Sequence, residues 1–188
     1  MNLFLWGALP YIAFTFLIVG TLVRFFYFER NWTTKSSQFL EKKQLRIANP
    51  LFHFGLLCVI GGHVVGVLIP KTWTAAIGIN DHMYHQGALY MGAVAGLIFI
   101  VGFLLLMKRR FTVAELKVNT SRLDKWLYLF LTLAIFSGMA GTLLNASGFF
   151  DYRVSIGPWF RSLLAFMPDP SLMEGVPFMF KFHMFAWM

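Results

Sequence analysis

Apolar residues run along this chain in long uninterrupted blocks, with short polar stretches between them. Four blocks cover about residues 3–27, 51–70, 87–107 and 126–146. At about 1.5 Å per helical residue, each is long enough to cross a hydrocarbon core of about 30 Å. A fifth block opens near Val176, and we expect that helix to be incomplete in this sequence. The pattern predicts an all-α integral membrane protein, a five-helix transmembrane bundle with a truncated fifth helix.

Composition supports the membrane class. The chain is 58% hydrophobic with a mean hydropathy of +0.66, whereas soluble domains are about 45–50% apolar. A transmembrane β-barrel is disfavoured because its strands would be short and alternating. The single cysteine, Cys58, excludes internal disulfides and a cysteine-bound iron–sulfur cluster within the chain. With no internal repeat, residues 1–188 are interpreted as one transmembrane domain.

The positive charges are concentrated in two of the four loops. The formal net charge is +8, but the cations lie between apolar blocks, so we interpret them as topology signals and lipid headgroup contacts and expect no nucleic-acid partner. The first loop holds Arg24, Arg30, Lys35, Lys42, Lys43 and Arg46, the third holds Lys108, Arg109, Arg110, Lys117, Arg122 and Lys125, and the other two hold only Lys71, Arg153 and Arg161.

The positive-inside rule then places the first and third loops in the cytoplasm and the N-terminus outside. We expect a multi-pass protein of a bacterial or archaeal cytoplasmic membrane. Arg109 and Arg110 have two interpretations: they meet an acidic surface of a cytoplasmic partner, or they only anchor the topology. The long loop from Ser147 to Gly175 is expected to fold over the outer face.

The second apolar block contains two histidines, His53 and His63, ten residues apart. On a helix they would be separated by about 15 Å and by about 80° around the axis, so one small metal ion cannot bind both. Ionisable residues inside a membrane helix are costly and usually functional. A single histidine of this kind can also be a hydrogen-bonded packing residue, which is the plain alternative for each of them.

A third histidine, His183, offers a partner for His63. It lies about seven residues into a helix entered from outside, while His63 lies about seven residues before the outer end of its own helix. Two imidazoles at one depth on antiparallel helices are the arrangement that ligates a b-type haem. Gly61, Gly62 and Gly66 would let a flat macrocycle approach the helix. His53 has no visible partner at its depth, so either a ligand is missing from this sequence or that haem is absent.

The same stretches carry a family resemblance. LFHFGLLCVIGGHVVGVLIP, LLLMKRRF and GVPFMFKFHM resemble, in order, the cytochrome b subunit of respiratory nitrate reductases, the gamma subunit. The resemblance implies five helices and two b haems. His63 and His183 would ligate the outer, distal haem. His53 would ligate the inner, proximal haem, with its second ligand beyond Met188.

The resemblance also implies a reaction and partners. Menaquinol or ubiquinol would be oxidised near the outer face, and electrons would pass to a cytoplasmic iron–sulfur beta subunit and a molybdenum alpha subunit that reduces nitrate. Some relatives have a lysine where Met83 stands here. His82 and His85 flank that position, so the candidate quinol-binding residues are Gly62, His63, His82 and His85; solvated loop residues are the alternative for His82 and His85.

Two other functions fit parts of the sequence. A haem b subunit of a sulfite- or heterodisulfide-reducing complex would have similar haem ligands and would differ in its soluble partner. A haem-free anchor, or a transporter with histidine metal sites, would not need the depth-matched pair. Transporters tend to show repeats and broken helices, and neither is visible in this sequence.

Overall fold

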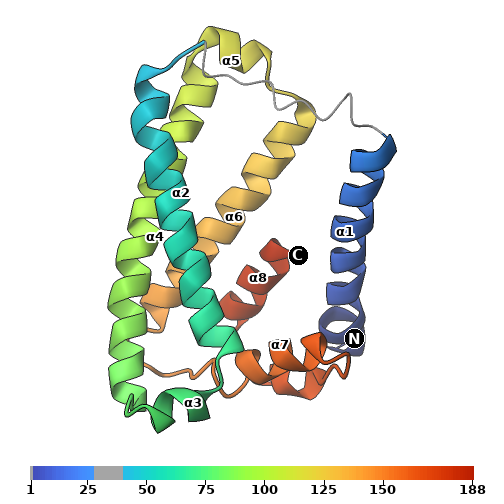
Figure 1. The fold of residues 1–188 in the computed structure, drawn as a ribbon, viewed down its shortest axis with the longest axis vertical. Helices are drawn as coiled ribbons and strands as arrows, with labels where there is room; N and C mark the ends of the chain where they lie inside the picture. The colour runs from blue at the N-terminus through green and yellow to red at the C-terminus, as the bar shows by residue number, and fades with distance from the viewer. Residues whose placement is uncertain (1, 28–39) are drawn as a thin grey trace.

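A computed structural model describes residues 2–27 and 40–188, and every regular element in these ranges is helical. In chain order the elements are η1 (Phe4–Ala8), α1 (Leu9–Tyr27), α2 (Lys43–His63), η3 (Val64–Leu68), α3 (Lys71–Ala76), α4 (Asp81–Thr112), α5 (Ala114–Val118), α6 (Arg122–Leu144), α7 (Ile156–Leu164), η4 (Pro170–Met173) and α8 (Phe178–Trp187) (Figure 1).

Four helical segments are long and apolar enough to cross a membrane. They are Phe4–Tyr27, Lys43–Leu68, Asp81–Thr112 and Arg122–Leu144, and they contain most of each of the four apolar blocks. The predicted all-α membrane fold is therefore confirmed. The second and third helices begin earlier than their apolar blocks, at Lys43 and Asp81, because polar residues form their first turns. Of the fifth helix, α8 provides ten residues, fewer than a span requires.

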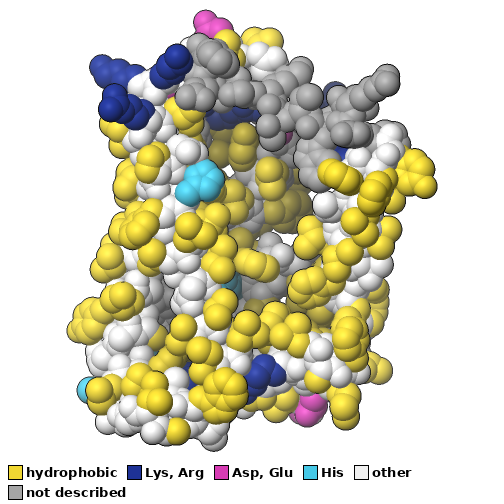
Figure 2. All heavy atoms as spheres, in the orientation of Figure 1, with side chains coloured by type: hydrophobic (Ala, Val, Ile, Leu, Met, Phe, Trp, Pro, Cys, Tyr) yellow, Lys and Arg dark blue, Asp and Glu magenta, His cyan; other side chains and the backbone are white. Residues whose placement is uncertain are grey.

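The two ends of the bundle differ in charge. The N-terminus, α3 and α7 lie at one end and α5 at the other (Figure 1). Lysine and arginine side chains gather at the α5 end (Figure 2), where Lys42, Lys43 and Arg46 line a surface hollow. Arg30 and Lys35 lie outside the described residues. Following the predicted orientation, the α5 end is called the inner end and the α3–α7 end the outer end.

Helices α2 and α4 pack together most extensively, through two glycines. A Cβ on Gly55 would lie 2.5 Å from the backbone nitrogen of Phe99, and one on Gly102 would lie 2.3 Å from that of Phe52. Only glycine allows the backbones to come this close, as is common between membrane helices. Phe99 and Phe103 then form a small core with Ile135 of α6.

The inner end is tied together by a buried ion pair. Arg109 is 4% exposed. Its Nε lies 2.8 Å from Oε2 of Glu41, and its guanidinium also donates to the Glu41 carbonyl at 2.7 Å. The backbone N–H of Gln44 and then Arg109 hold the pKa of Glu41 below its ordinary value. Arg109 is therefore paired within its own chain, and contact of Arg109 and Arg110 with an acidic partner stays a prediction.

The segment after α6 folds over the outer end and attaches α1. Trp159 of α7 donates its Nε1–H to the Trp6 carbonyl at 2.8 Å, and Tyr11 of α1 donates to the Leu163 carbonyl at 2.8 Å. Trp6 and Trp159 belong to a buried apolar cluster with Ile156, Leu163, Met173 and Val176. Above this attachment α1 stands away from α2, and the surface between them is hollowed (Figures 1 and 2).

Candidate functional site

The structure brings the rings of His63 of α2 and His183 of α8 close together. Their ring centroids lie 5.9 Å apart, and the ring planes are inclined by 39°. Metal–nitrogen bonds of about 2 Å on both sides of one iron put two imidazole centroids roughly 6 Å apart. The observed separation therefore fits two histidines that would hold one haem between them.

The hydrogen bonds of His63 leave the nitrogen that would ligate iron available. Its Nδ1 lies 2.8 Å from the carbonyl oxygen of Val59, one turn earlier in α2. A carbonyl only accepts, so Nδ1 carries the proton and Nε2 of the neutral ring carries the lone pair. A ligating histidine commonly donates its other ring N–H in this way, and the bond fixes the tautomer and the ring orientation.

His183 rests against α6. Its Nδ1 lies 3.1 Å from Oγ of Ser137. A Cβ on Gly138 would come within 2.8 Å of its Cε1. Only a glycine at position 138 therefore leaves enough space for the His183 ring. Sequence reasoning missed Ser137 and Gly138. The signal that could have found them is the run of small residues SGMAG in an otherwise bulky block.

The glycines near His63 fall into two kinds. A Cβ on Gly61 or Gly62 would meet no atom within 4 Å, so the helix surface beside His63 is open there. At Gly66 the space is filled, because a Cβ would lie 3.1 Å from the Tyr152 ring and 3.2 Å from the Tyr84 hydroxyl. The expectation of open space is therefore met at Gly61 and Gly62 and is wrong at Gly66.

His53 has the same local arrangement without a facing ring. Its Nδ1 lies 2.9 Å from the Asn49 carbonyl oxygen, and its ring packs edge-on against Phe52 with centroids 5.2 Å apart. His53 is exposed toward the inner end of α2. The other four histidines of the chain lie toward the outer end, so within the described ranges no imidazole faces His53.

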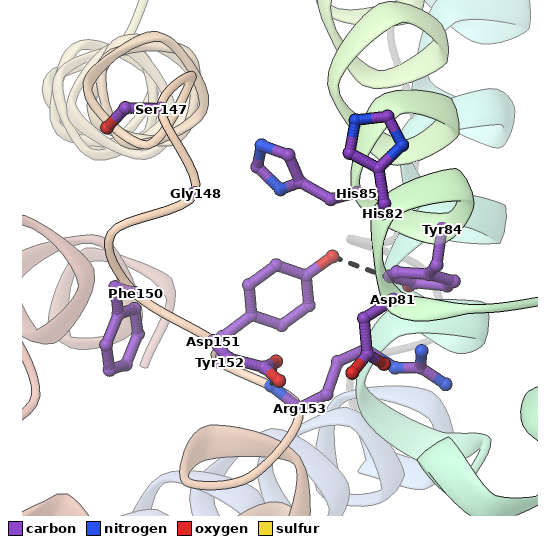
Figure 3. A pocket seen from close by; sticks show the side chains of 10 residues that line it. All are labelled: Asp81, His82, Tyr84, His85, Ser147, Gly148, Phe150, Asp151, Tyr152 and Arg153. Carbon is purple, nitrogen blue, oxygen red and sulfur yellow. Dashed lines mark hydrogen bonds between the residues drawn. The ribbon is translucent and has the colours of Figure 1, made fainter.

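His82 and His85 line a cavity of about 290 Å³ at the start of α4 (Figure 3). His85 projects toward the turn at Gly148, where its Nε2–H donates to the Ala146 carbonyl at 3.1 Å. Its Nδ1 therefore carries the lone pair. The whole lining is Asp81, His82, Tyr84, His85, Ser147, Gly148, Phe150, Asp151, Tyr152 and Arg153.

Two tyrosines connect this cavity to η3, and an arginine connects it to α3. Tyr152 donates to the Tyr84 hydroxyl at 3.4 Å, and burial raises the pKa of Tyr152 well above its ordinary value. Arg153, 4% exposed, places its guanidinium 3.7 Å from the Tyr84 ring centroid and donates to Thr74 at 2.7 Å. Because both tyrosines touch Gly66, the cavity begins about one turn beyond His63. Sequence reasoning missed all three residues, and nothing in the loop sequence identifies Tyr152 or Arg153.

No larger ligand cluster competes with the facing pair. Across residues 2–27 and 40–188, no three His, Cys, Asp or Glu side chains converge as they would around a protein-bound metal ion. The described geometry thus offers two ring nitrogens on opposite helices, which is the donor set of a bis-histidine haem.

Comparison with known proteins agrees with the family resemblance. The family described as "Nitrate reductase gamma subunit" matches residues 2–188. The nitrate reductase gamma chain of Bacillus subtilis is 47% identical over 180 residues, which are 95% of this chain and 81% of that protein.

More distant relatives include two further proteins. The respiratory nitrate reductase 1 gamma chain of Escherichia coli is 27% identical over 98% of this chain and 82% of its own length. The nitrate reductase-like protein NarX of Mycobacterium tuberculosis is 39% identical over 95% of this chain, but the match covers only 28% of that longer protein. The chain therefore belongs to the nitrate reductase gamma subunit family, as a membrane subunit of a nitrate reductase complex.

Proposed function

We propose that this chain is the cytochrome b subunit that oxidises quinol at the outer side of the membrane and delivers the electrons to a cytoplasmic iron–sulfur beta subunit and molybdenum alpha subunit. The observation that carries the proposal is the facing of His63 and His183, 5.9 Å apart, each with Nδ1 hydrogen-bonded. These two residues would hold the outer b haem, which supplies one-electron redox chemistry when bound.

His53 would hold an inner haem on the same helix. Its Nδ1–H is already given to a carbonyl, so its Nε2 is prepared to ligate in the same way as that of His63. Two haem sites at different depths support electron movement across the bilayer. Moving one charge through 100 mV costs about 2.3 kcal/mol, so quinol oxidation outside with nitrate reduction inside would conserve energy.

The cavity at the start of α4 is proposed as the quinol site. His82 and His85 line it, whereas Gly62 and His63 of the predicted set lie outside its lining. A quinol loses two protons with its two electrons, so the site needs a base. The Nδ1 lone pair of His85 is such a base, because its Nε2–H is held by the Ala146 carbonyl. A Cβ on Gly62 would meet no atom within 4 Å, so the helix surface beside His63 would also be open to a ligand.

A reduced-minus-oxidised spectrum of the purified complex tests the proposal. We expect a b-type α band, and we expect the His63→Ala complex to lose the outer-haem part of it. His82→Ala is the matched control and should keep the full band, because His82 lines only the cavity. A flat wild-type spectrum would favour the haem-free anchor, and a full band in His63→Ala would refute the ligand assignment. Nitrate reduction by the same preparation separates it from sulfite- or heterodisulfide-reducing complexes.

A further inference from the structure

We infer that Ser137 is a positioning residue that lowers the reduction potential of the outer haem by accepting a hydrogen bond from His183. The inference rests on the proposed function, since it assumes that His183 ligates that haem. It adds a residue on α6, a helix that contributes no histidine.

The direction of the hydrogen bond follows from the neighbours of the Ser137 hydroxyl. Oγ lies 3.1 Å from Nδ1 of His183 and 3.2 Å from the carbonyl oxygen of Ala134. The carbonyl can only accept, so the single hydroxyl proton goes to Ala134 and the oxygen lone pair accepts the His183 Nδ1–H. The opposite direction would put the ring proton on Nε2 and prevent that nitrogen from ligating iron.

The surroundings make this hydrogen bond persistent. Ser137 is 6% exposed, so water does not compete well for its hydroxyl. The His183 ring lies directly over Gly138, where a Cβ would come within 2.8 Å of the ring. The ring is therefore pressed against α6 at the position where Ser137 can reach it.

The two imidazoles of the pair differ in what holds them. His63 donates to a backbone carbonyl of its own helix, as His53 does, and no side-chain substitution removes that acceptor. His183 contacts α6 instead, where the Ser137 hydroxyl lies 3.1 Å from its Nδ1 and the Ala134 backbone also hydrogen-bonds the ring. An acceptor on the imidazole N–H makes the ligand more electron-rich, which favours oxidised iron and lowers the potential. Ser137 is thus the side chain whose substitution would change the hydrogen bonding, and with it the reduction potential, of this histidine pair.

A redox titration of the outer haem in the intact complex tests the inference. Ser137→Ala should keep the haem and raise its midpoint potential, by a shift on the order of a tenfold change in the redox equilibrium, which is about 59 mV for a one-electron couple. Ser137→Thr keeps the hydroxyl and should restore a midpoint near that of the wild type. Ser137→Cys, a weaker acceptor, should lie between them and supplies the measurement if the alanine complex retains no haem.

Thr132→Val is the matched control. Thr132 is another α6 hydroxyl, and it donates to the Tyr128 carbonyl of its own helix at 2.6 Å. Its removal should leave the midpoint unchanged. An unshifted midpoint in both Ser137→Ala and Ser137→Cys, or an equal shift in Thr132→Val, would overturn the inference and leave the proposed function intact. A wild-type complex without haem would refute the proposed function itself.

Discussion

The two halves of α2 each carry a histidine, in different surroundings. His53 and His63 each give Nδ1–H to the carbonyl four residues earlier, at 2.9 and 2.8 Å, and each is exposed from the helix. His63 faces His183, whereas His53 faces no imidazole within the described residues. A helix can therefore prepare a histidine as a ligand by itself, but a second helix must complete the site.

The two halves of α2 also differ in how closely they pack against other helices. The inner half is pressed against α4 at Gly55, and Gly102 of α4 approaches the backbone at Phe52. The outer half has open space beside Gly61 and Gly62. Glycine thus has two uses on one helix. In the inner half it brings two helix backbones together, and in the outer half it leaves the surface beside His63 open.

The largest expected effect comes from removing one histidine at a time. His63→Ala should abolish outer-haem absorbance and lower quinol-dependent nitrate reduction more than about 100-fold, since even the partners of ligands contribute 10–100-fold. His53→Ala should leave the outer haem and its midpoint potential in place. Haem quantification and redox titration of both complexes measure this contrast. If the two variants lose the same haem, the two halves of α2 are not independent sites.

Gly138→Ala should weaken the outer site without removing a ligand. Its Cβ would lie 2.8 Å from Cε1 of His183, so the ring must move. We expect the retention of the outer haem to fall by about 10–100-fold, measured by haem loss to an acceptor protein. Gly141→Ala is the control on the same helix, because its Cβ would meet only Phe180, at 3.8 Å. Equal haem loss in both variants would contradict the conclusion that Gly138 makes room for the His183 ring.

Gly102→Ala should destabilise the inner half of the bundle. A Cβ 2.3 Å from the Phe52 backbone nitrogen cannot be accommodated by a rotamer change, so α2 and α4 must separate. Overpacking of this kind costs about 1–3 kcal/mol of unfolding free energy. Thermal unfolding in detergent measures the cost. Gly87→Ala, also on α4 but with open space at its Cβ, should unfold like the wild type, and a similar loss there would point to helix propensity instead.

The smallest effect concerns the exposed ion pairs of the outer end. Lys71 lies 2.8 Å from Asp81 and 3.1 Å from Asp151, and hydrogen bonds to Asp81 and then Asp151 raise its pKa above 10.5. Lys71→Met should cost less than about 1 kcal/mol, because exposed pairs are screened by water and salt.

The pH dependence of that variant has a definite sign. A raised folded-state pKa means that the stabilisation is complete below the unfolded value and is lost as the pH rises through the folded value. The difference in melting temperature between wild type and Lys71→Met should thus persist at neutral pH, begin to shrink near about pH 10.5, and vanish above the raised folded-state pKa of Lys71. Arg109→Met, at the buried inner pair, should lower stability more. A larger loss for Lys71→Met would reverse the expected order of the two ends.

Much of this molecule was predictable from its sequence. The four apolar blocks predicted the four long helices, because only internally bonded segments of about 20 residues satisfy their backbones in lipid. The uneven distribution of lysine and arginine predicted the charged end of the bundle. The equal depths of His63 and His183 followed from counting residues along antiparallel helices, and the structure brings the two rings together.

Only the tertiary structure determined which residues of other helices contact these histidines, glycines and charged side chains. Depth is set by distance along one helix, so the sequence determines it. Four contacts depend on how helices far apart in the chain rotate and approach one another. They are the Ser137 hydroxyl beside His183, the packing of the His183 ring on Gly138, the two tyrosines against Gly66, and the buried pair of Arg109 with Glu41. Hydropathy does not encode that rotation, because lipid-facing and packing residues are equally apolar in a membrane.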